Sequence, residues 1–228
     1  MSKIEAGDCH ETCEEGNMKK AKLQLALDDV LLEDALELVQ SVAGFVDVIE
    51  IGTPLIEREG MRAVRALRQS CPDKEILADT KIMDVGEYAA AIAFEAGADY
   101  CTVLGCTDLI TIGGCLKAAE KFGRKAVVDM ICVDDIEARV RKLESIGANC
   151  IAAHTGLDRQ TAGGTPLSDL RTLRAAARKS ELFVAGGIKP NTVENYLAAG
   201  ADVIIVGAGI TKAEDPAAAA RAFREKIQ

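Results

Sequence analysis

One connector recurs three times in this 228-residue sequence, and it restricts the folds that the chain can adopt. The copies lie at residues 95–99, 146–149 and 199–202, and they read EAGAD, IGAN and AGAD. Each is typical of a helix that stops at a glycine and steps at once into a strand. Repetition of one helix-to-strand connector in one chain predicts a repeated strand–helix unit.

Eight such units can be traced along the chain. The predicted strands are short and apolar throughout, as expected of parallel strands buried on both faces; they cover residues 23–27, 46–51, 76–79, 100–104, 126–130, 150–153, 182–185 and 203–206. The helical pattern predicts helices over residues 31–42, 57–70, 86–96, 109–121, 136–146, 167–178, 192–199 and 216–227.

The number and spacing of these units predict an α/β fold, a single (β/α)₈ TIM barrel. Eight units in about 205 residues fit a compact barrel better than an open doubly wound sheet. No glycine-rich dinucleotide fingerprint follows the first strand, which also counts against the open sheet. We expect the barrel to span residues 22–228, preceded by a polar N-terminal extension at residues 1–21.

Composition excludes several classes of function. Hydrophobic residues are 49% and charged residues 28%, which is typical of a globular protein. A net charge of −9 and the absence of Trp disfavour nucleic acid as a partner. No apolar run approaches the ~20 residues that span a membrane, and no secretory signal is recognisable. We therefore expect a cytoplasmic protein without a membrane partner.

The eight cysteines are expected to be reduced in that compartment. Four of them lie in apolar contexts where cysteine acts as a small buried hydrophobe, namely Cys101, Cys115, Cys132 and Cys150. Cys9, His10 and Cys13 in the extension could bind an adventitious metal, but they lack the second ligand pair of a zinc site.

The stretch from Asp79 to Asp84, which reads DTKIMD, follows an apolar strand. Because side chains alternate along a strand, Asp79 and Lys81 point the same way if the strand continues that far. Asp84 lies beyond, where the chain turns into the next helix. Two carboxylates and an ammonium are costly to bury unless they pair or bind something. A solvated turn or a structural ion pair is the alternative to a functional site.

Further polar residues collect at the predicted strand ends, where the active sites of TIM barrels form. They are Asp28, Glu50, Asp129 and His154, in addition to Asp79 and Lys81. Each has a structural alternative: Asp28 as a helix N-cap, Glu50 and Asp129 as ion-paired groups, and His154 as a core residue. Together they would crowd one end of a barrel with partly buried charge at a cost in stability, which favours a functional site.

The seventh and eighth strands end instead in glycine-rich turns without charged residues, around Gly187 and around Gly207 and Ala208. Such turns let backbone N–H groups approach an anion, and these loops are the usual phosphate site of such barrels. Tight turns that need a positive φ are the alternative. Carboxylates with one histidine suit a hard cation such as Mg²⁺. The residues thus predict metal-assisted handling of an oxyanion on a small phosphorylated sugar.

The motif Asp79-x-Lys81-x-x-Asp84 resembles the Asp-x-Lys-x-x-Asp signature of the orotidine 5′-monophosphate decarboxylase superfamily. Residues 25–28, 48–53, 154–156 and 185–187 are similar to one branch of it, and the resemblance covers about residues 22–227. Enzymes of that branch either condense formaldehyde with D-ribulose 5-phosphate or decarboxylate 3-keto-L-gulonate 6-phosphate.

The resemblance implies roles for most of these residues. It implies Mg²⁺ held by Glu50 and Asp79. It implies catalytic and substrate contacts from Asp28, Lys81, Asp84 and His154. It implies a homodimer in which Asp84 enters the partner's site. Asp129, Gly187, Gly207 and Ala208 are expected to bind the substrate and its phosphate. The implied partners are a phosphorylated pentulose or hexulose and formaldehyde.

Four positions bear on which reaction the chain carries out. The decarboxylating members typically have Glu, Arg, Thr and Arg where this chain has Asp129, Leu157, Ala185 and Ala208. The aldol-type condensation, an aldehyde-lyase reaction, is therefore expected, with the decarboxylation as the alternative. A pentose-phosphate epimerase would use a histidine-containing metal site, yet only one histidine, His154, lies outside the extension. A non-catalytic sugar-phosphate-binding protein is the alternative from another class.

Overall fold

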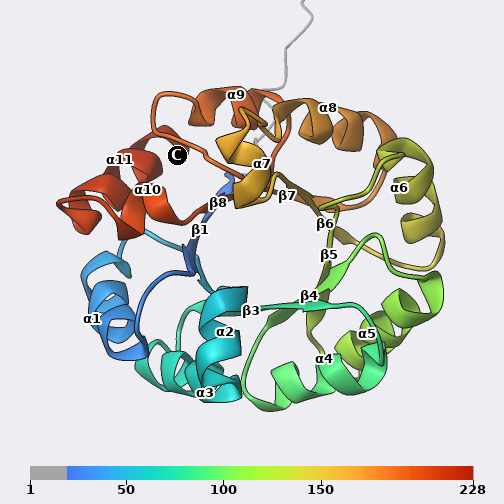
Figure 1. The fold of residues 1–228 in the computed structure, drawn as a ribbon, viewed down its shortest axis with the longest axis horizontal. Helices are drawn as coiled ribbons and strands as arrows, with labels where there is room; N and C mark the ends of the chain where they lie inside the picture. The colour runs from blue at the N-terminus through green and yellow to red at the C-terminus, as the bar shows by residue number, and fades with distance from the viewer. Residues whose placement is uncertain (1–19, 228) are drawn as a thin grey trace, which may run out of the picture.

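Eight parallel strands close into a barrel in the computed structural model, which describes residues 20–227. The strands follow one another around the barrel in sequence order, and the helices surround it (Figure 1). The predicted single (β/α)₈ barrel is confirmed. The predictions about Cys9, His10 and Cys13 lie outside the described residues.

The elements have the following bounds. The strands are β1 Lys22–Leu27, β2 Val48–Ile51, β3 Glu75–Ile82, β4 Tyr100–Leu104, β5 Lys125–Asp129, β6 Cys150–His154, β7 Glu181–Ala185 and β8 Val203–Val206. The helices are α1 Leu32–Val42, α2 Thr53–Glu59, α3 Met61–Ser70, α4 Gly86–Glu95, α5 Leu109–Phe122, α6 Ile136–Ser145, α7 Leu157–Thr161, α8 Leu167–Ala176, α9 Val193–Ala198, α10 Ala208–Thr211 and α11 Pro216–Ile227. No helix in the described part of the chain is both long and apolar enough to cross a membrane.

Several expectations need correction. The helix predicted over residues 57–70 is two helices, because Gly60 between them adopts a φ of +60° that breaks the helix. The short helices α7 and α10 were not predicted, and β3 runs on to Ile82 instead of ending at Asp79. Cys132 is exposed in the turn after β5, with a φ of +58°, so it is not a buried hydrophobe.

The repeated connectors behave as predicted. Their glycines all have positive φ, namely +105° at Gly97, +93° at Gly147 and +87° at Gly200. In two of the three copies an acid follows two residues later and contacts the start of the preceding strand. Asp99 accepts the backbone N–H of Ile76 at 2.8 Å, and Asp202 accepts that of Leu182 at 2.8 Å. The connector therefore ends a helix and fixes the start of the preceding strand in one step.

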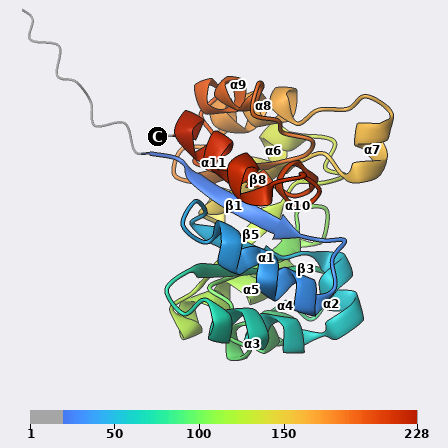
Figure 2. The ribbon, with the colours of Figure 1, turned by 90° about the vertical axis from the view of Figure 1, so that its left-hand side faces the viewer.

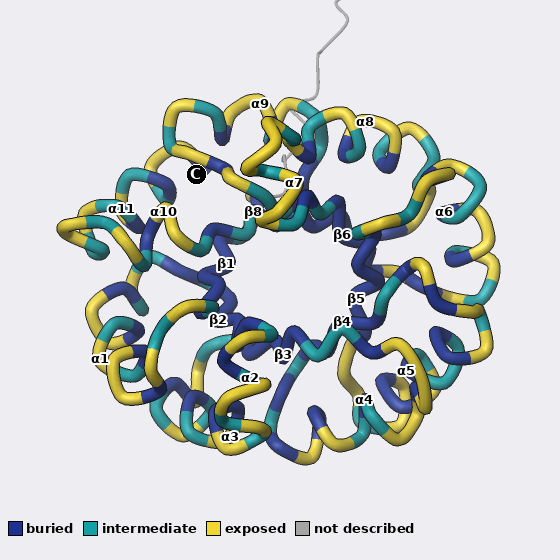
Figure 3. The backbone as a smooth tube through the Cα atoms, in the orientation of Figure 1, coloured by how far each residue is buried: buried dark blue, intermediate teal, exposed yellow. Residues whose placement is uncertain are grey.

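An apolar cluster fills the middle of the barrel and separates its two polar ends. It consists of Val48, Leu77, Tyr100, Val127, Cys150, Ala152, Phe183 and Val203. On its N-terminal side, Lys22 pairs with Glu75, and Lys125 pairs with Glu181 at 3.0 Å. The strands are buried, whereas the outer surfaces of the helices are exposed (Figure 3). Inward-facing residues alternate with outward-facing residues along every strand. A second set of inward-facing polar residues therefore lies on the C-terminal side of the apolar cluster.

Glu144, near the C-terminal end of α6, accepts hydrogen bonds from the turn before β7. Its carboxylate accepts the backbone N–H of Lys179 at 2.9 Å and the hydroxyl of Ser180 at 2.8 Å. Burial raises the pKa of this carboxyl, but the hydrogen bonds outweigh burial and hold the pKa below its usual 4.5. A lowered folded-state pKa means that the carboxylate stabilises the fold above pH 4.5 and ceases to do so as the pH falls through the folded-state value.

We therefore expect Glu144→Gln to reduce the free energy of unfolding by about 1 kcal/mol at pH 7, a value discounted for solvent screening at this half-exposed site. Thermal denaturation at a series of pH values checks this. The gap in Tm between wild type and variant should narrow as the pH falls below 4.5. The exposed Glu137→Gln is the matched control on the same helix. Equal Tm values at pH 7 would contradict the prediction.

Candidate active site

The candidate site lies at the mouth formed by the C-terminal ends of the strands. In Figure 2 the arrow of β1 points toward the side on which α2 and α7 lie, and the chain ends on the opposite side. Four predicted residues are joined there by direct contacts: Asp79 and Lys81 on β3, Asp129 on β5 and His154 on β6. The strand ends are adjacent in the closed barrel, which is why residues far apart in sequence meet.

Lys81 is the cation at the centre of this group. Its Nζ pairs with Asp79 Oδ2 and lies 3.7 Å from Asp129 Oδ2. Desolvation lowers the pKa of Lys81, but the charges of Asp79 and Asp129 outweigh it, so the pKa is raised. The side chain is thus held as an ammonium. The sequence did not decide whether these residues form an ion pair. They do, and the pair lies at the mouth of the barrel.

Asp79 is buried and is held from two sides by threonine hydroxyls. Thr53 Oγ1 donates to Asp79 Oδ2 at 2.9 Å, and Thr102 Oγ1 donates to Asp79 Oδ1 at 2.7 Å. The carboxylate is 5% exposed and therefore depends on these partners for its orientation. Its direction is fixed before any ligand arrives.

Asp129 and His154 form a second pair. His154 Nδ1 lies 2.8 Å from Asp129 Oδ2, and the backbone N–H of Ile131 donates to Asp129 Oδ1 at 2.9 Å. Burial raises the pKa of Asp129, but the hydrogen bond and charge of His154 and the charge of Lys81 outweigh it, so the pKa is lowered. Asp129 is therefore ionised, and its carboxylate holds the imidazole of His154 in place. The predicted role of Asp129 in binding the substrate and its phosphate stays a prediction.

His154 is not a satisfied core histidine. Its side chain is 20% exposed, and the contact to Asp129 engages Nδ1. An imidazole has two ring nitrogens, and a partner on one of them fixes the ring and defines the role of the other. The arrangement leaves Nε2 as the nitrogen that can exchange a proton with a ligand in the mouth.

Glu50 and Asp28 extend the cluster on β2 and at the end of β1. Glu50 Oε2 accepts the amide of Gln24 at 2.6 Å, and Glu50 is 7% exposed. Burial and the charges of Asp79 and Asp28 raise the pKa of Glu50 well above its usual value. Burial and Asp79 also raise the pKa of Asp28. The N-cap of α1 is Leu31, so Asp28 does not cap that helix.

The backbone beside Asp28 leaves no room for a larger residue at position 52. A Cβ on Gly52 would lie 2.1 Å from Asp28 Oδ1 and 2.8 Å from the carbonyl oxygen of Leu27. Glycine at this turn lets the Asp28 carboxylate rest against the start of α2. The turn therefore fixes the place of Asp28 at the edge of the site.

The donor set fits a hard divalent cation. Burial and the nearby charge of Asp79 raise the pKa values of Glu50 and Asp28, and a dication bound among these carboxylates would relieve the repulsion. Within residues 20–227 no three acidic, histidine or cysteine side chains form a closed metal centre. Mg²⁺ commonly binds to one or two carboxylates and completes its shell with water and substrate oxygens. Glu50 and Asp79 meet that requirement.

The glycine-rich turns after β7 and β8 lie at the same mouth. Gly186 and Gly187 have φ values of +131° and +66°, so both need glycine. A Cβ on Gly186 would lie 2.8 Å from the carbonyl oxygen of Thr155. The other turn leads through Gly207 into α10 at Ala208, which is exposed. The first turn is therefore a tight turn that needs glycine, and the phosphate-binding role of both turns stays a prediction.

Asp84 is the predicted residue that the structure does not bring to the cluster. It is exposed, and its Oδ1 accepts the backbone N–H of Val85 at 2.7 Å. Within the described chain it forms no salt bridge. Asp84 therefore points to solvent beside the start of α4.

Sequence reasoning missed two residues that support the cluster, Gln24 and Thr102, whereas Thr53 belongs to the stretch of residues 48–53 that the sequence had singled out. A signal existed for the two that were missed. Gln24 and Thr102 lie two residues from the inward-facing Lys22 and Tyr100, so strand alternation places them inside the barrel. Their polarity at a buried position indicates a hydrogen-bonded role.

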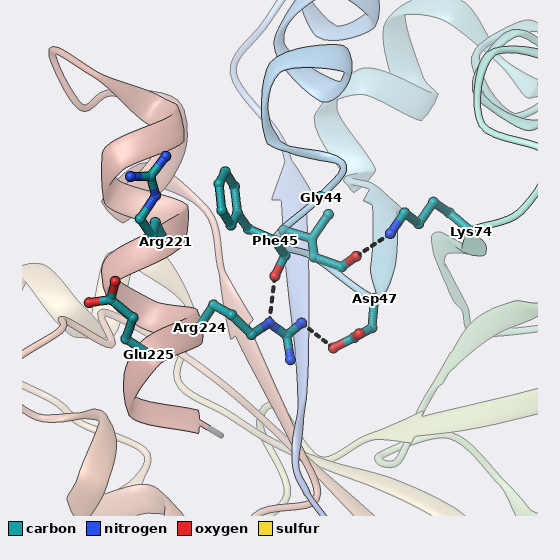
Figure 4. Close-up of a pocket in the computed structure, with 8 residues that line it drawn as sticks. Gly44, Phe45, Asp47, Lys74, Arg221, Arg224 and Glu225 are labelled. Atoms are coloured by element: carbon teal, nitrogen blue, oxygen red, sulfur yellow. Dashed lines mark hydrogen bonds and ion pairs between the residues drawn. The ribbon is translucent and has the colours of Figure 1, made fainter.

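A cavity of about 490 Å³ opens at the opposite end of the barrel, beside the turn before β2 (Figure 4). Its cations already have protein partners: Lys74 Nζ donates to the carbonyl of Val46 and Arg224 Nε to that of Phe45, each at 2.8 Å. Arg221 lies over the ring of Phe45, 5.2 Å from its centroid. Because these groups stabilise the N-terminal face and the polar cluster lies elsewhere, we place the chemistry at the C-terminal mouth.

Fold and site together define a TIM-barrel enzyme whose reactive groups come from the ends of several strands. The sequence matches the orotidine 5′-phosphate decarboxylase / HUMPS family over residues 21–223. The chain belongs to this family, and the predicted resemblance is confirmed.

Individual relatives are close. The chain is 42% identical over 207 residues to 3-hexulose-6-phosphate synthase of Staphylococcus aureus, which covers 91% of this chain and 99% of the relative. The crystal structure of 3-hexulose-6-phosphate synthase from Salmonella typhimurium matches with a TM-score of 0.89 and 50% identity, over 90% of this chain and 98% of that one. The structure of 3-keto-L-gulonate-6-phosphate decarboxylase from Vibrio cholerae matches less well, with a TM-score of 0.78 and 33% identity. The match covers 91% of this chain and 97% of that one.

Proposed function

We propose that this protein is a 3-hexulose-6-phosphate synthase, an aldehyde-lyase that reversibly condenses formaldehyde with D-ribulose 5-phosphate to D-arabino-hex-3-ulose 6-phosphate. The observation that carries the proposal is the joined cluster of Asp79, Lys81, Asp129 and His154 at the barrel mouth. It places a fixed ammonium beside a positioned imidazole, as removal of a proton next to a carbonyl requires. The relatives of 42–50% identity named as this synthase support the same reaction.

His154 is the proposed base in this reaction. Held by Asp129 through Nδ1, it takes a proton from C1 of the pentulose phosphate at Nε2. The electron pair moves toward the C2 oxygen and gives a 1,2-enediolate, and Lys81 lies where it stabilises the developing negative charge. C1 of the enediolate then forms the new carbon–carbon bond to formaldehyde as the C2 carbonyl re-forms, and the protonated His154 returns its proton to the alkoxide that formaldehyde becomes. Asp28 orients a substrate hydroxyl, and Asp79 and Asp129 keep Lys81 protonated.

Glu50 and Asp79 are the proposed ligands of Mg²⁺, which when bound supplies Lewis-acid polarisation of the substrate's carbonyl oxygen. The backbone amides of Gly187, Gly207 and Ala208 are the proposed phosphate site. Backbone amides alone bind phosphate through partial charges, without an arginine.

The reactive site is proposed to be completed by a second copy of the chain. Asp84 lies in an exposed apolar face whose members are Met83, Val85, Tyr88, Ile92 and Ile110, between 37% and 88% exposed. Exposed apolar residues in the loop before α4, on α4 and on α5 favour burial against a partner. In a symmetric dimer Asp84 would enter the partner's site and orient a substrate hydroxyl there.

The decarboxylase is the weaker alternative. Its typical arginines would stand near Leu157, which is 74% exposed at the start of α7, and near Ala208 at the start of α10. Neither side chain supplies positive charge. Asp129 in place of a longer Glu reaches His154 directly, at 2.8 Å.

The proposal is tested by following the loss of formaldehyde in the presence of D-ribulose 5-phosphate, with Mg²⁺ and with a chelator. We expect turnover that depends on both the sugar phosphate and Mg²⁺. A parallel assay with 3-keto-L-gulonate 6-phosphate distinguishes the synthase from the decarboxylase. A decarboxylase would turn over 3-keto-L-gulonate 6-phosphate faster than it would consume formaldehyde. Binding of ribulose 5-phosphate without loss of formaldehyde would indicate a sensor and would refute the proposal.

The base assignment has its own test. We expect His154→Ala to slow exchange of the C1 proton of ribulose 5-phosphate with D₂O by about 10²–10⁴-fold, the range for loss of a general base. NMR of the substrate in D₂O measures this without formaldehyde. The exposed Lys212→Ala, on the rim, is the control and should exchange at the wild-type rate. Exchange by His154→Ala at that rate would show that another group is the base.

A further inference from the structure

The end of β3 is irregular at the point where its reactive residues stand. Ala78 pairs with Cys101 and Ile82 with Val103, so four steps on β3 oppose two on β4. Within this bulge Lys81 adopts a φ of +43°, a left-handed conformation that is uncommon outside glycine. Such a conformation costs on the order of 1–3 kcal/mol and persists only when surrounding groups hold it.

Thr102 on β4 is the residue that holds the bulge. Its hydroxyl donates to Asp79 Oδ1 at 2.7 Å and accepts the backbone N–H of Lys81 at 2.9 Å. Its carbonyl oxygen accepts the hydroxyl of Thr80 at 2.9 Å. Thr102, which is 6% exposed, thus contacts three consecutive residues of the bulge: Asp79 and Lys81 through its side chain, and Thr80 through its backbone carbonyl.

The hydroxyl matters because it must donate and accept at once. A hydroxyl has one O–H donor and two acceptor lone pairs, so it satisfies the Asp79 carboxylate and the Lys81 amide together. Valine has the same shape but can do neither. With the hydroxyl removed, a buried N–H and one buried carboxylate oxygen lose a partner, and the left-handed backbone at Lys81 loses a constraint.

We propose that Thr102 is a positioning residue: through its hydroxyl it fixes the Lys81 backbone and the Asp79 carboxylate so that the ammonium faces the barrel mouth. The expected effect on turnover rests on the proposed function. The placement of Lys81 by Thr102 rests on the geometry alone. Thr53 shares only the second task, because its hydroxyl donates to Asp79 but does not reach the Lys81 backbone. Thr102 joins the two reactive residues of β3 into one unit.

The test compares Thr102→Val and Thr102→Ala, which lack the hydroxyl, with Thr102→Ser, which keeps it. We expect kcat to fall by about 10–100-fold in Val and Ala, the range for residues that orient metal ligands, with a smaller change in KM. Serine should recover most of kcat. The control is Thr111→Val, a buried threonine on α5 whose hydroxyl interacts with Asp108 away from the site. It should keep wild-type kcat.

Crystal structures of the variants give a readout that needs no turnover. In Thr102→Val or, if that variant does not fold, Thr102→Ala, we expect Lys81 to leave the left-handed region and its Nζ to move from Asp79. Lys81 unmoved in a folded hydroxyl-free variant, or no recovery of kcat by serine, would overturn the proposal. Failure of the wild type to consume formaldehyde would instead refute the proposed function, and the structures would still decide whether Thr102 positions Lys81.

Discussion

Replacing Lys81 with alanine is expected to lower kcat/KM by about 10³-fold, at the upper end of the range for losing one preorganised electrostatic group. The ammonium is the cation that directly contacts both Asp79 and Asp129. Without it the oxyanion that forms beside these carboxylates loses the ammonium that stabilises it, and both carboxylates lose an ion-pair partner in a partly buried site. Steady-state kinetics on formaldehyde and ribulose 5-phosphate measure the effect.

Two further variants make this prediction specific. Lys212→Ala removes an exposed lysine that pairs with Asp29 at the rim and should keep kcat/KM within about 2-fold of wild type, as expected of an exposed ion pair. Lys81→Arg retains the charge but not the shape of the ammonium and should lie between wild type and alanine. If folded Lys81→Ala keeps kcat/KM within tenfold of wild type, the charge at Lys81 does not carry the chemistry.

The barrel could be predicted because its signals are local. A glycine that must adopt positive φ at a helix end is visible in the sequence, and Gly97, Gly147 and Gly200 all do so. Buried parallel strands are apolar on both faces, so each can be recognised as a short apolar run. Their order around the barrel is their order in the chain. The helices α7 and α10 were missed because five and four residues are too few to show a helical period.

The candidate site was partly predictable for a different reason. Residues at strand ends of a barrel must share one mouth, so Asp79, Lys81 and His154 could be grouped without coordinates. Their pairing could not be derived in this way, since it depends on register. Asp129 reaches His154 because Asp129 pairs with Ala152 across β5 and β6. Likewise, the residues of the bulge that extends β3 form hydrogen bonds with Thr102, a residue of another strand: Lys81 donates to its hydroxyl, and Asp79 accepts from it.

Asp84 yields the second large expected effect, because it lies away from the cluster in its own chain. We expect Asp84→Ala and Lys81→Ala chains each to be inactive alone and to regain activity when mixed. With random exchange in a two-fold symmetric dimer, half of the dimers are mixed and each has one intact site, so about a quarter of wild-type activity should return. The intact site combines Lys81 of one chain with Asp84 of the other.

The comparison depends on subunit exchange, so the mixed dimers are confirmed with two different affinity tags before the assay. Mixing Lys81→Ala with Asp79→Ala is the matched control: both changes lie in one cluster of one chain, so neither site of a mixed dimer is intact and no activity should return. Confirmed mixed dimers of Asp84→Ala and Lys81→Ala without activity would mean that each site is built within one chain. Recovery would explain why an acid sits exposed among Met83, Val85 and Tyr88: the face that excludes water between two copies would also deliver a carboxylate to the partner's substrate.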